Sequence, residues 1–284
     1  MLVLTLATAL LLPAAALQQT TDTTVAVQRG QRLEVAAHSG SITVRGWNRN
    51  AVRIRARTDE GGGVDVDTRG SRVSVSASGR RGGPVEVAFE ITAPAWMGVS
   101  LSGVETDMTV SGLAAPVEVE TVQGGVDVDG GVDQITLHSV QGSVTLRNAR
   151  GRIEVGSVNE ELRLTDISGQ VSAETVNGDV TLSRVTSASV AVTTVNGDVT
   201  FSGPIAAGGR YSFATHNGDV TLELPGTPNA GVYVSTFQGD FESDFPVTLT
   251  STRRKRFNFT LGSGSARIEL ESFQGTIALR RAAR

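Results

Sequence analysis

The chain contains no cysteine, a single lysine, three histidines and few aromatic residues, and each shortage excludes a class of chemistry. Without cysteine there is no disulfide, no thiolate metal ligand and no lipid-modified cysteine at a mature N-terminus. The only lysine, Lys255, does not follow a glycine-rich stretch, which excludes a P-loop, and no Gly-x-Ser-x-Gly nucleophile elbow occurs. His38, His138 and His216 are too scattered for a metal site, so we expect no cofactor.

Positive charge is concentrated in one place only. The formal net charge is −4, and without a basic face the chain is not expected to bind nucleic acid. The exception is the run Arg253, Arg254, Lys255 and Arg256, a candidate site for anionic glycans, lipid headgroups or phosphate polymers. The competing interpretation is a solvated hairpin tip that blocks edge-to-edge aggregation.

The N-terminus has the pattern of an export signal. An apolar run from Leu2 to Leu12 is followed by Pro13 and three alanines, which predicts a signal peptide over 1–16 and a mature start at Leu17. The run is shorter than the roughly 20 residues of a membrane span, and no later segment is predicted to cross a membrane. No basic residue precedes the run, the first being Arg29, which indicates either a start further upstream or an atypical signal. The alternative interpretation is a buried N-terminal segment of a cytoplasmic protein. We expect an exported protein of the periplasm or cell surface.

Repetition dominates the rest of the chain. Glycine is abundant, valine and threonine recur, and no helical periodicity follows the first fifteen residues, which indicates many short strands joined by tight turns. A phrase of hydroxyl residue, apolar residue, amide and glycine recurs, with its fourth position at 124, 142, 160, 178 and 197. That position holds Glu160 in one copy, where the turn glycine is lost. The amides of the phrase are Gln123, Gln141, Asn159, Asn177, Asn196, Asn217, Gln238 and Gln274.

The spacing allows two arrangements of strands. Apolar and polar residues alternate between the turns, which is typical of strands with one buried face. Consecutive strands are able to pair as antiparallel hairpins, for which Asn-Gly is a favoured turn. The amide, however, returns only at every second turn, which favours a parallel stack of two-strand coils. In that stack the amides form a hydrogen-bonded ladder, and the Ser/Thr residues of the phrase line an inner corner.

The sequence therefore predicts an all-β fold, a right-handed single-stranded parallel β-solenoid of about 18 residues per coil, capped at both ends. Its expected parts are the signal peptide 1–16, an N-terminal β cap with the first strands over 17–103, the solenoid repeats over 104–244, and a C-terminal hairpin with the last coil over 245–284. The segment 245–261 breaks the spacing and is expected to protrude as a hairpin.

The chain resembles bacterial "putative adhesin" families, which are described as β-strand-repeat domains of unknown function. The resemblance is carried by Gly40–Trp47, by the strand that leads to Ala93–Pro94, and by the tandem Val-Asn-Gly-Asp-Val turns. It implies a β-helix, export and an adhesive or envelope role, and it transfers no active-site residue.

A column of aspartates is the feature of the sequence that most resembles a metal site or an active site. Asp179, Asp198, Asp219 and Asp240 share one repeat column, which suits either calcium or ordinary solvated turns. Polysaccharide-cleaving β-helices use outward acids and arginines, and Asp179 or Asp198 with Arg184 are the closest equivalents here. A flat, wet repeat face does not perturb a carboxylate in the way that acid–base catalysis requires.

We predict a non-catalytic, adhesin-like binding or scaffolding module of the envelope, with an envelope polysaccharide or a surface protein as its partner. The alternatives are an accessory regulator of envelope-stress signalling and a polysaccharide-degrading enzyme. The sequence does not predict the oligomeric state.

Overall fold

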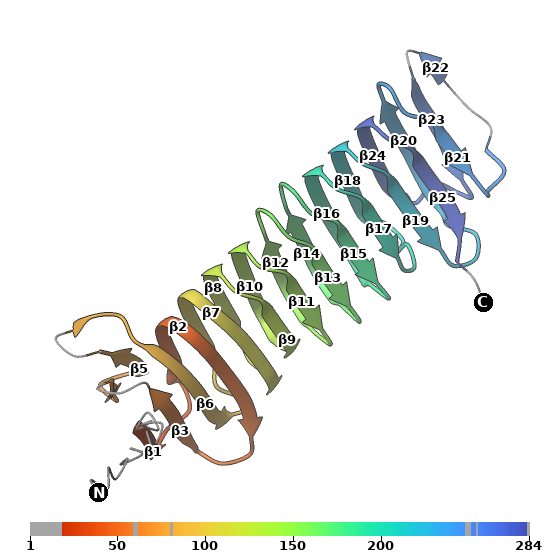
Figure 1. Cartoon of the computed structure of the whole chain (residues 1–284). Helices are drawn as coiled ribbons and strands as arrows, with labels where there is room; N and C mark the ends of the chain where they lie inside the picture. The colour runs from red at the N-terminus through yellow and green to blue at the C-terminus, as the bar shows by residue number, and fades with distance from the viewer. Residues whose placement is uncertain (1–18, 59–61, 80–81, 248–250, 254, 283–284) are drawn as a thin grey trace, which may run out of the picture.

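The computed structural model describes residues 19–58, 62–79, 82–247, 251–253 and 255–282. The expected signal peptide over 1–16 lies outside them. The described chain is built from β-strands, most of which pair in parallel in an open, elongated stack (Figure 1). None of the described residues forms a helix long and apolar enough to cross a membrane.

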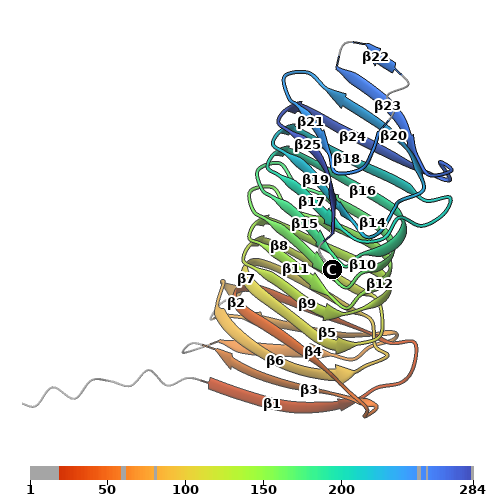
Figure 2. The ribbon, with the colours of Figure 1, turned by 90° about the vertical axis from the view of Figure 1, so that its right-hand side faces the viewer.

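The middle of the stack consists of two rows of parallel strands, and the chain passes from one row to the other at each turn (Figures 1 and 2). The first row contains β8 (Val117–Gln123), β10 (Val132–Gln141), β12 (Arg150–Gly156), β14 (Ser168–Glu174), β16 (Thr186–Asn196) and β18 (Arg210–Asn217). The second row contains β9 (Val126–Gly130), β11 (Val144–Arg147), β13 (Leu162–Thr165), β15 (Val180–Ser183), β17 (Val199–Ser202) and β19 (Val220–Leu224).

Register follows the repeat phrase. Ile135 pairs with Ile153, and Ile153 pairs with Val171, so the partners lie eighteen residues apart in the chain. Between β14 and β16 the register shifts after Gly169, which accommodates the one extra residue of that repeat. The inward apolar residues of both rows, mostly Val, Leu, Ile and Phe with Ala173 and Tyr211, have almost no exposure, so they form one continuous core along the stack.

At the N-terminal end the strands become longer and partly antiparallel. β2 (Arg32–Trp47) and β7 (Val99–Leu113) span both rows and pair with each other. β2 also pairs in parallel with β5 (Arg72–Ser78) and β6 (Glu86–Pro94), while β1 (Gln19–Ala26), β3 (Ala51–Thr58) and β4 (Gly63–Asp67) pair antiparallel. Asp22 of β1 binds the guanidinium of Arg53 on β3, which lowers the pKa of Asp22 to about 2.

At the C-terminal end the order in space departs from the order in the chain. The remaining strands are β20 (Ala230–Thr236), β21 (Phe241–Ser243), β22 (Ser251–Arg253), β23 (Arg256–Leu261), β24 (Ala266–Gln274) and β25 (Ile277–Arg281). β24 pairs with β18 on one side and β20 on the other, and β25 likewise lies between β19 and β21. The final coil is therefore inserted inside the stack. The segment expected to form a hairpin contains β22 and β23, which pair antiparallel, and β23 also pairs antiparallel along β20, which otherwise would present an unpaired edge.

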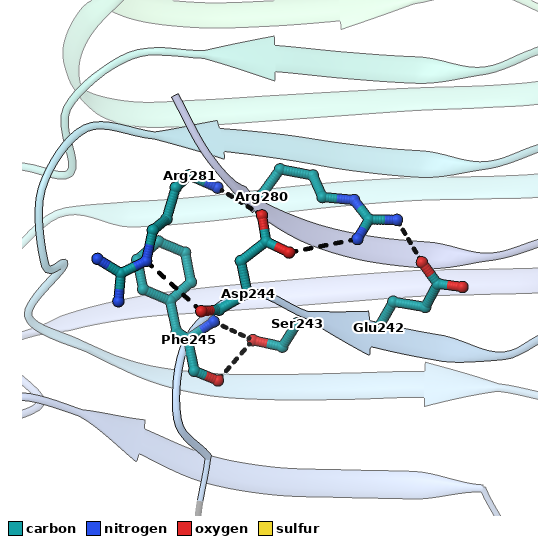
Figure 3. A network of polar contacts seen from close by, with 6 residues as sticks. All are labelled: Glu242, Ser243, Asp244, Phe245, Arg280 and Arg281. Carbon is teal, nitrogen blue, oxygen red and sulfur yellow. Dashed lines mark hydrogen bonds and ion pairs between the residues drawn. The ribbon is translucent and has the colours of Figure 1, made fainter. Parts of the chain in front are cut away.

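Side chains tie the inserted strand β25 to β21 (Figure 3). The guanidinium of Arg280 binds the carboxylates of Glu242 and Asp244, and the backbone N–H of Arg281 donates to Asp244 at 3.1 Å. That backbone donor, and then the Arg280 guanidinium, hold the pKa of Asp244 below its usual range. Because these groups are exposed, they fix the register of the two strands more than they add to stability.

Candidate functional site

The repeated turn is built around a buried hydroxyl. The Ser/Thr residues of the phrase point inward, as expected, and each is at most 7% exposed. Seven of these hydroxyls donate to a backbone carbonyl of the neighbouring coil, and Thr194, for example, donates to Gly178 O at 3.2 Å; the hydroxyl of Thr236 instead accepts the backbone N–H of Gly239. Since a buried hydroxyl without a partner is costly, these bonds fix the turns one above another. The buried hydroxyls are Thr121, Ser139, Ser157, Thr175, Thr194, Thr215, Thr236 and Ser272.

The amides of the phrase are exposed and stacked in one column. Side-chain amide bonds of 2.8–3.1 Å join Gln123 to Gln141, Gln274 to Gln238, and the four asparagines in succession: Asn159, Asn177, Asn196 and Asn217. Every bonded pair consists of two residues of the same type. No bond joins Gln141 to Asn159 or Asn217 to Gln274 in the described chain, because the extra methylene of glutamine displaces its amide from the shorter one.

Replacing Asn196 with aspartate is expected to lower the free energy of unfolding by about 1 kcal/mol. The change removes the donor to Asn177 Oδ1 and places two acceptors against each other. The loss should shrink as the pH falls below the new carboxyl's pKa, because the protonated acid regains a donor. Chemical denaturation across pH measures this. Asn258→Asp is the matched control, since Asn258 is exposed and its side chain bonds to no described residue; equal losses in both variants would contradict the ladder's contribution.

The second residue of the phrase forms an exposed apolar stripe. Valines 37–46% exposed occupy this position in six successive coils, and the next three coils carry aromatic rings. His216 stacks on Phe273 with ring centroids 4.6 Å apart, and Phe273 stacks on Phe237 at 4.8 Å. We call this column the apolar stripe; it consists of Val104, Val122, Val140, Val158, Val176, Val195, His216, Phe273 and Phe237.

A depression of about 1180 Å³ lies at the aromatic end of the apolar stripe. Lys255 and Arg256 of the basic run line it together with Phe237 and Phe273. The Lys255 ammonium donates to Gly239 O at 3.2 Å. Of the other two residues of the run, Arg254 lies outside the described residues, and Arg253 is described only by its backbone pairing with Arg256.

The opposite row of strands carries a second surface, flat and polar. Its outward residues include six half-buried hydroxyl side chains in register, with Thr181, Thr200 and Thr221 paired in succession. None of the six hydroxyls bonds to a described residue. We call this surface the hydroxyl face; it consists of Thr165, Thr181, Ser183, Thr200, Ser202 and Thr221.

Carboxylates of the aspartate column accept hydrogen bonds from backbone N–H groups of the next coil. Asp179 accepts the backbone N–H of Asp198 at 2.8 Å, and Asp198 accepts that of Asp219 at 2.8 Å. Arg184, the candidate partner in a catalytic arrangement, instead binds Asp166 and holds the pKa of that carboxyl below its usual range. Among the described residues no three acidic or histidine side chains gather as a metal site.

The basic run and the amides were predicted from the sequence, but the apolar stripe was not. The signal was present, because an apolar residue directly follows the inward hydroxyl in most copies of the phrase. In a strand with period two, that position points outward.

The described strand path is similar to several solved structures. A "putative adhesin" from Bacteroides fragilis is 13% identical, with 92% of this chain and 97% of that chain covered and a TM-score of 0.45. A "putative lipid binding protein" from Parabacteroides distasonis is 8% identical, covering 92% and 96% with a TM-score of 0.46. A "putative adhesin" from Parabacteroides merdae is 12% identical, covering 92% and 95% with a TM-score of 0.37.

A comparison with curated proteins finds no match. The family comparison is different, because it covers almost the whole chain. Residues 18–280 match the family described as Toastrack DUF4097, whose fold is β-solenoid-like, and the chain belongs to that family.

Proposed function

We propose that the protein is an exported, non-catalytic module that binds a polysaccharide of the bacterial envelope. The hydroxyl face is the observation that carries this proposal. Its rows lie about 4.8 Å apart, and alternate residues within a strand lie about 6.8 Å apart, so it is a regular grid of donors and acceptors. A linear glycan repeats its own hydroxyls along its length and is able to bond to such a grid at many points.

The charges around the hydroxyl face support binding rather than turnover. Arg147 binds Asp127 at 2.6 Å, and Arg163 binds Glu161 at 2.8 Å, all on exposed side chains. Carboxylates that are exposed and paired with arginine lack the desolvated, enclosed environment in which a general acid works. The family resemblance also brings no catalytic motif to this chain.

At the level of the fold, we propose a right-handed solenoid with coils of about eighteen residues. The antiparallel strands β1, β3 and β4 at one end, and β22 and β23 at the other, act as its caps. Support comes from the aggregation risk of an open parallel edge, which such strands cover. We propose export because of the apolar N-terminal run, and the alanines that follow it give a mature start at Leu17.

The chain from Leu17 onward, mixed with insoluble envelope polysaccharide and sedimented, is expected to pellet with it. A Thr181→Val/Thr200→Val/Thr221→Val variant keeps the side-chain shape, removes three hydroxyls of the face, and should lose most of the pelleting. Thr136→Val is the matched control, because Thr136 is a half-buried, outward threonine of the first row. Pelleting unaffected by the triple variant would remove the hydroxyl face from the proposal. If the wild-type protein stays in the supernatant, glycan binding is wrong and a protein partner, including one in envelope-stress signalling, is the next hypothesis.

A further inference from the structure

The aromatic end of the apolar stripe has the composition of a ligand site. Phe237 is 63% exposed and Phe273 is 38% exposed, although both follow an inward hydroxyl in a tight turn. Neither ring is required there for packing, since valine fills the same position in six other coils. Large exposed apolar side chains that are contiguous mark interaction surfaces.

The depression beside these rings carries a positive charge. Its lining contains two cations, Lys255 and Arg256, and one carboxylate, Glu271. All three side chains are exposed, and no ion pair joins any of them to a described residue. The hollow has an apolar wall formed by Phe237, Phe273 and Ala214, with charged groups beside it. An apolar wall next to a net positive charge suits a small molecule with an anionic head and an apolar body.

The geometry of the rings decides against a sugar. Saccharides stack on free aromatic faces, but both faces of Phe273 are covered, with interplanar angles of 9° to His216 and 8° to Phe237. Phe273 therefore presents only its edge, one face of Phe237 is covered by the same stack, and the valines beyond His216 offer no hydrogen bond. A second copy of the chain is also a poor occupant, because a column one side chain wide falls well short of the roughly 800 Å² per partner in a stable interface.

The narrowness of the apolar stripe matches an unbranched hydrocarbon chain. An acyl chain spans about 15 Å, half of the ~30 Å hydrocarbon core of a bilayer. Coils lie about 4.8 Å apart, so a chain with its head at Lys255 and Arg256 covers three steps along the stripe. Those steps run from Phe237 through Phe273 and His216 to Val195.

We propose that this end of the apolar stripe binds an anionic amphiphile, a linear hydrocarbon chain with a carboxylate or phosphate head. The head lies at Lys255 and Arg256, and the chain lies across Phe237 and Phe273 toward Val195. The site is on the row of strands opposite the hydroxyl face, so it is separate from the glycan site and is tested with different ligands and variants.

Dodecanoate titrated into the protein is expected to shift the aromatic NMR signals of Phe237 and Phe273. Acetate has the head without the chain, and dodecyltrimethylammonium has the chain with the opposite charge; each should bind about tenfold more weakly or worse. Phe237→Ser and the double variant Lys255→Gln/Arg256→Gln should each weaken dodecanoate binding about tenfold. Neither change touches the core, because Phe237 and both cations are exposed.

Val122→Ser is the matched control, since Val122 belongs to the apolar stripe but lies seven coils from Phe237, beyond the reach of one chain. It should leave the affinity unchanged. Absence of any shift with dodecanoate, or equal losses in Val122→Ser and Phe237→Ser, would overturn the proposal. Flotation with phosphatidylglycerol vesicles separates two sources: flotation lost in Phe237→Ser assigns the site to a membrane lipid, and dodecanoate binding without flotation assigns it to a free amphiphile.

Discussion

Replacing Gly124 with alanine is expected to destabilise the protein by about 3 kcal/mol or more. The added methyl group would clash with the neighbouring coil, and alanine rarely adopts the backbone conformation found at this position. Gly124 has φ +134°, a conformation that side chains of L-residues rarely adopt. A Cβ there would lie 2.2 Å from the backbone oxygen of Thr106 in the neighbouring coil. That oxygen also accepts the buried hydroxyl of Thr121, so a shift of the turn breaks this bond as well.

Gly125→Ala is the control for this experiment, one residue further along the same turn. Its φ is not in the left-handed region, and the nearest atom to an added Cβ is 3.8 Å away. The free energy of unfolding should change by less than about 1 kcal/mol, and the restricted unfolded chain favours a small gain. Chemical denaturation of the two variants gives the comparison. Similar losses in both would mean that the close approach of neighbouring turns does not limit this position.

The same close approach recurs through the stack and explains why the phrase ends in glycine. At each of the following positions an added Cβ would lie within 2.2 Å of a backbone oxygen of the neighbouring turn: Gly142, Gly178, Gly197, Gly218, Gly239 and Gly275. The exception, Glu160, coincides with a local loss of pairing. Gly178 donates its N–H to Asn196 O and Gly197 donates to Asn217 O, whereas the described chain has no such bond from Gly142 to Asn159 or from Glu160 to Asn177.

The all-β, largely parallel architecture was predictable because the amide returns at every second turn and the apolar residues alternate between turns. The order of coils at the C-terminal end was not. The phrases Thr236-Phe237-Gln238-Gly239 and Ser272-Phe273-Gln274-Gly275 have the same pattern, so each is equally able to stack on Asn217. Only the pairing of β23 along β20, a contact with no repeat signature, distinguishes the terminal position from the inserted one.

The candidate sites, like the fold, were predictable from the sequence only in part. The positive charge of Lys255 and Arg256 was visible in the sequence, because charge needs no context. Their placement beside Phe237 and Phe273 was not, since it depends on the insertion of β24 between β18 and β20. If the coils followed chain order, Phe237 would stack directly on His216.

Because β24 and β25 lie inside the stack, a mutation in β24 is expected to affect more strands than it would if the coils followed chain order. Leu270 lies only eleven residues before the last strand, β25, ends at Arg281, yet it is fully buried, with Phe213 of β18 on one side and Val234 of β20 on the other. Leu270→Ala is expected to cost about 2–5 kcal/mol, the loss of an interior leucine. Leu261→Ala is the control, because Leu261 is also buried but belongs to β23, and its described strand neighbours are β20 and β22.

Hydrogen exchange distinguishes an inserted coil from a terminal coil that frays. In Leu270→Ala, amides of β20 and β23 should lose protection together with those of β24, because the strands beyond the inserted coil connect to the rest of the stack through it. Leu261→Ala should affect β20 and β23 while β24 and β18 stay protected. A terminal coil would instead open alone, since only its own bonds hold it. Loss confined to 266–281 with an unchanged denaturation midpoint would therefore contradict the insertion, because an interior coil cannot loosen without uncoupling the strands on its far side.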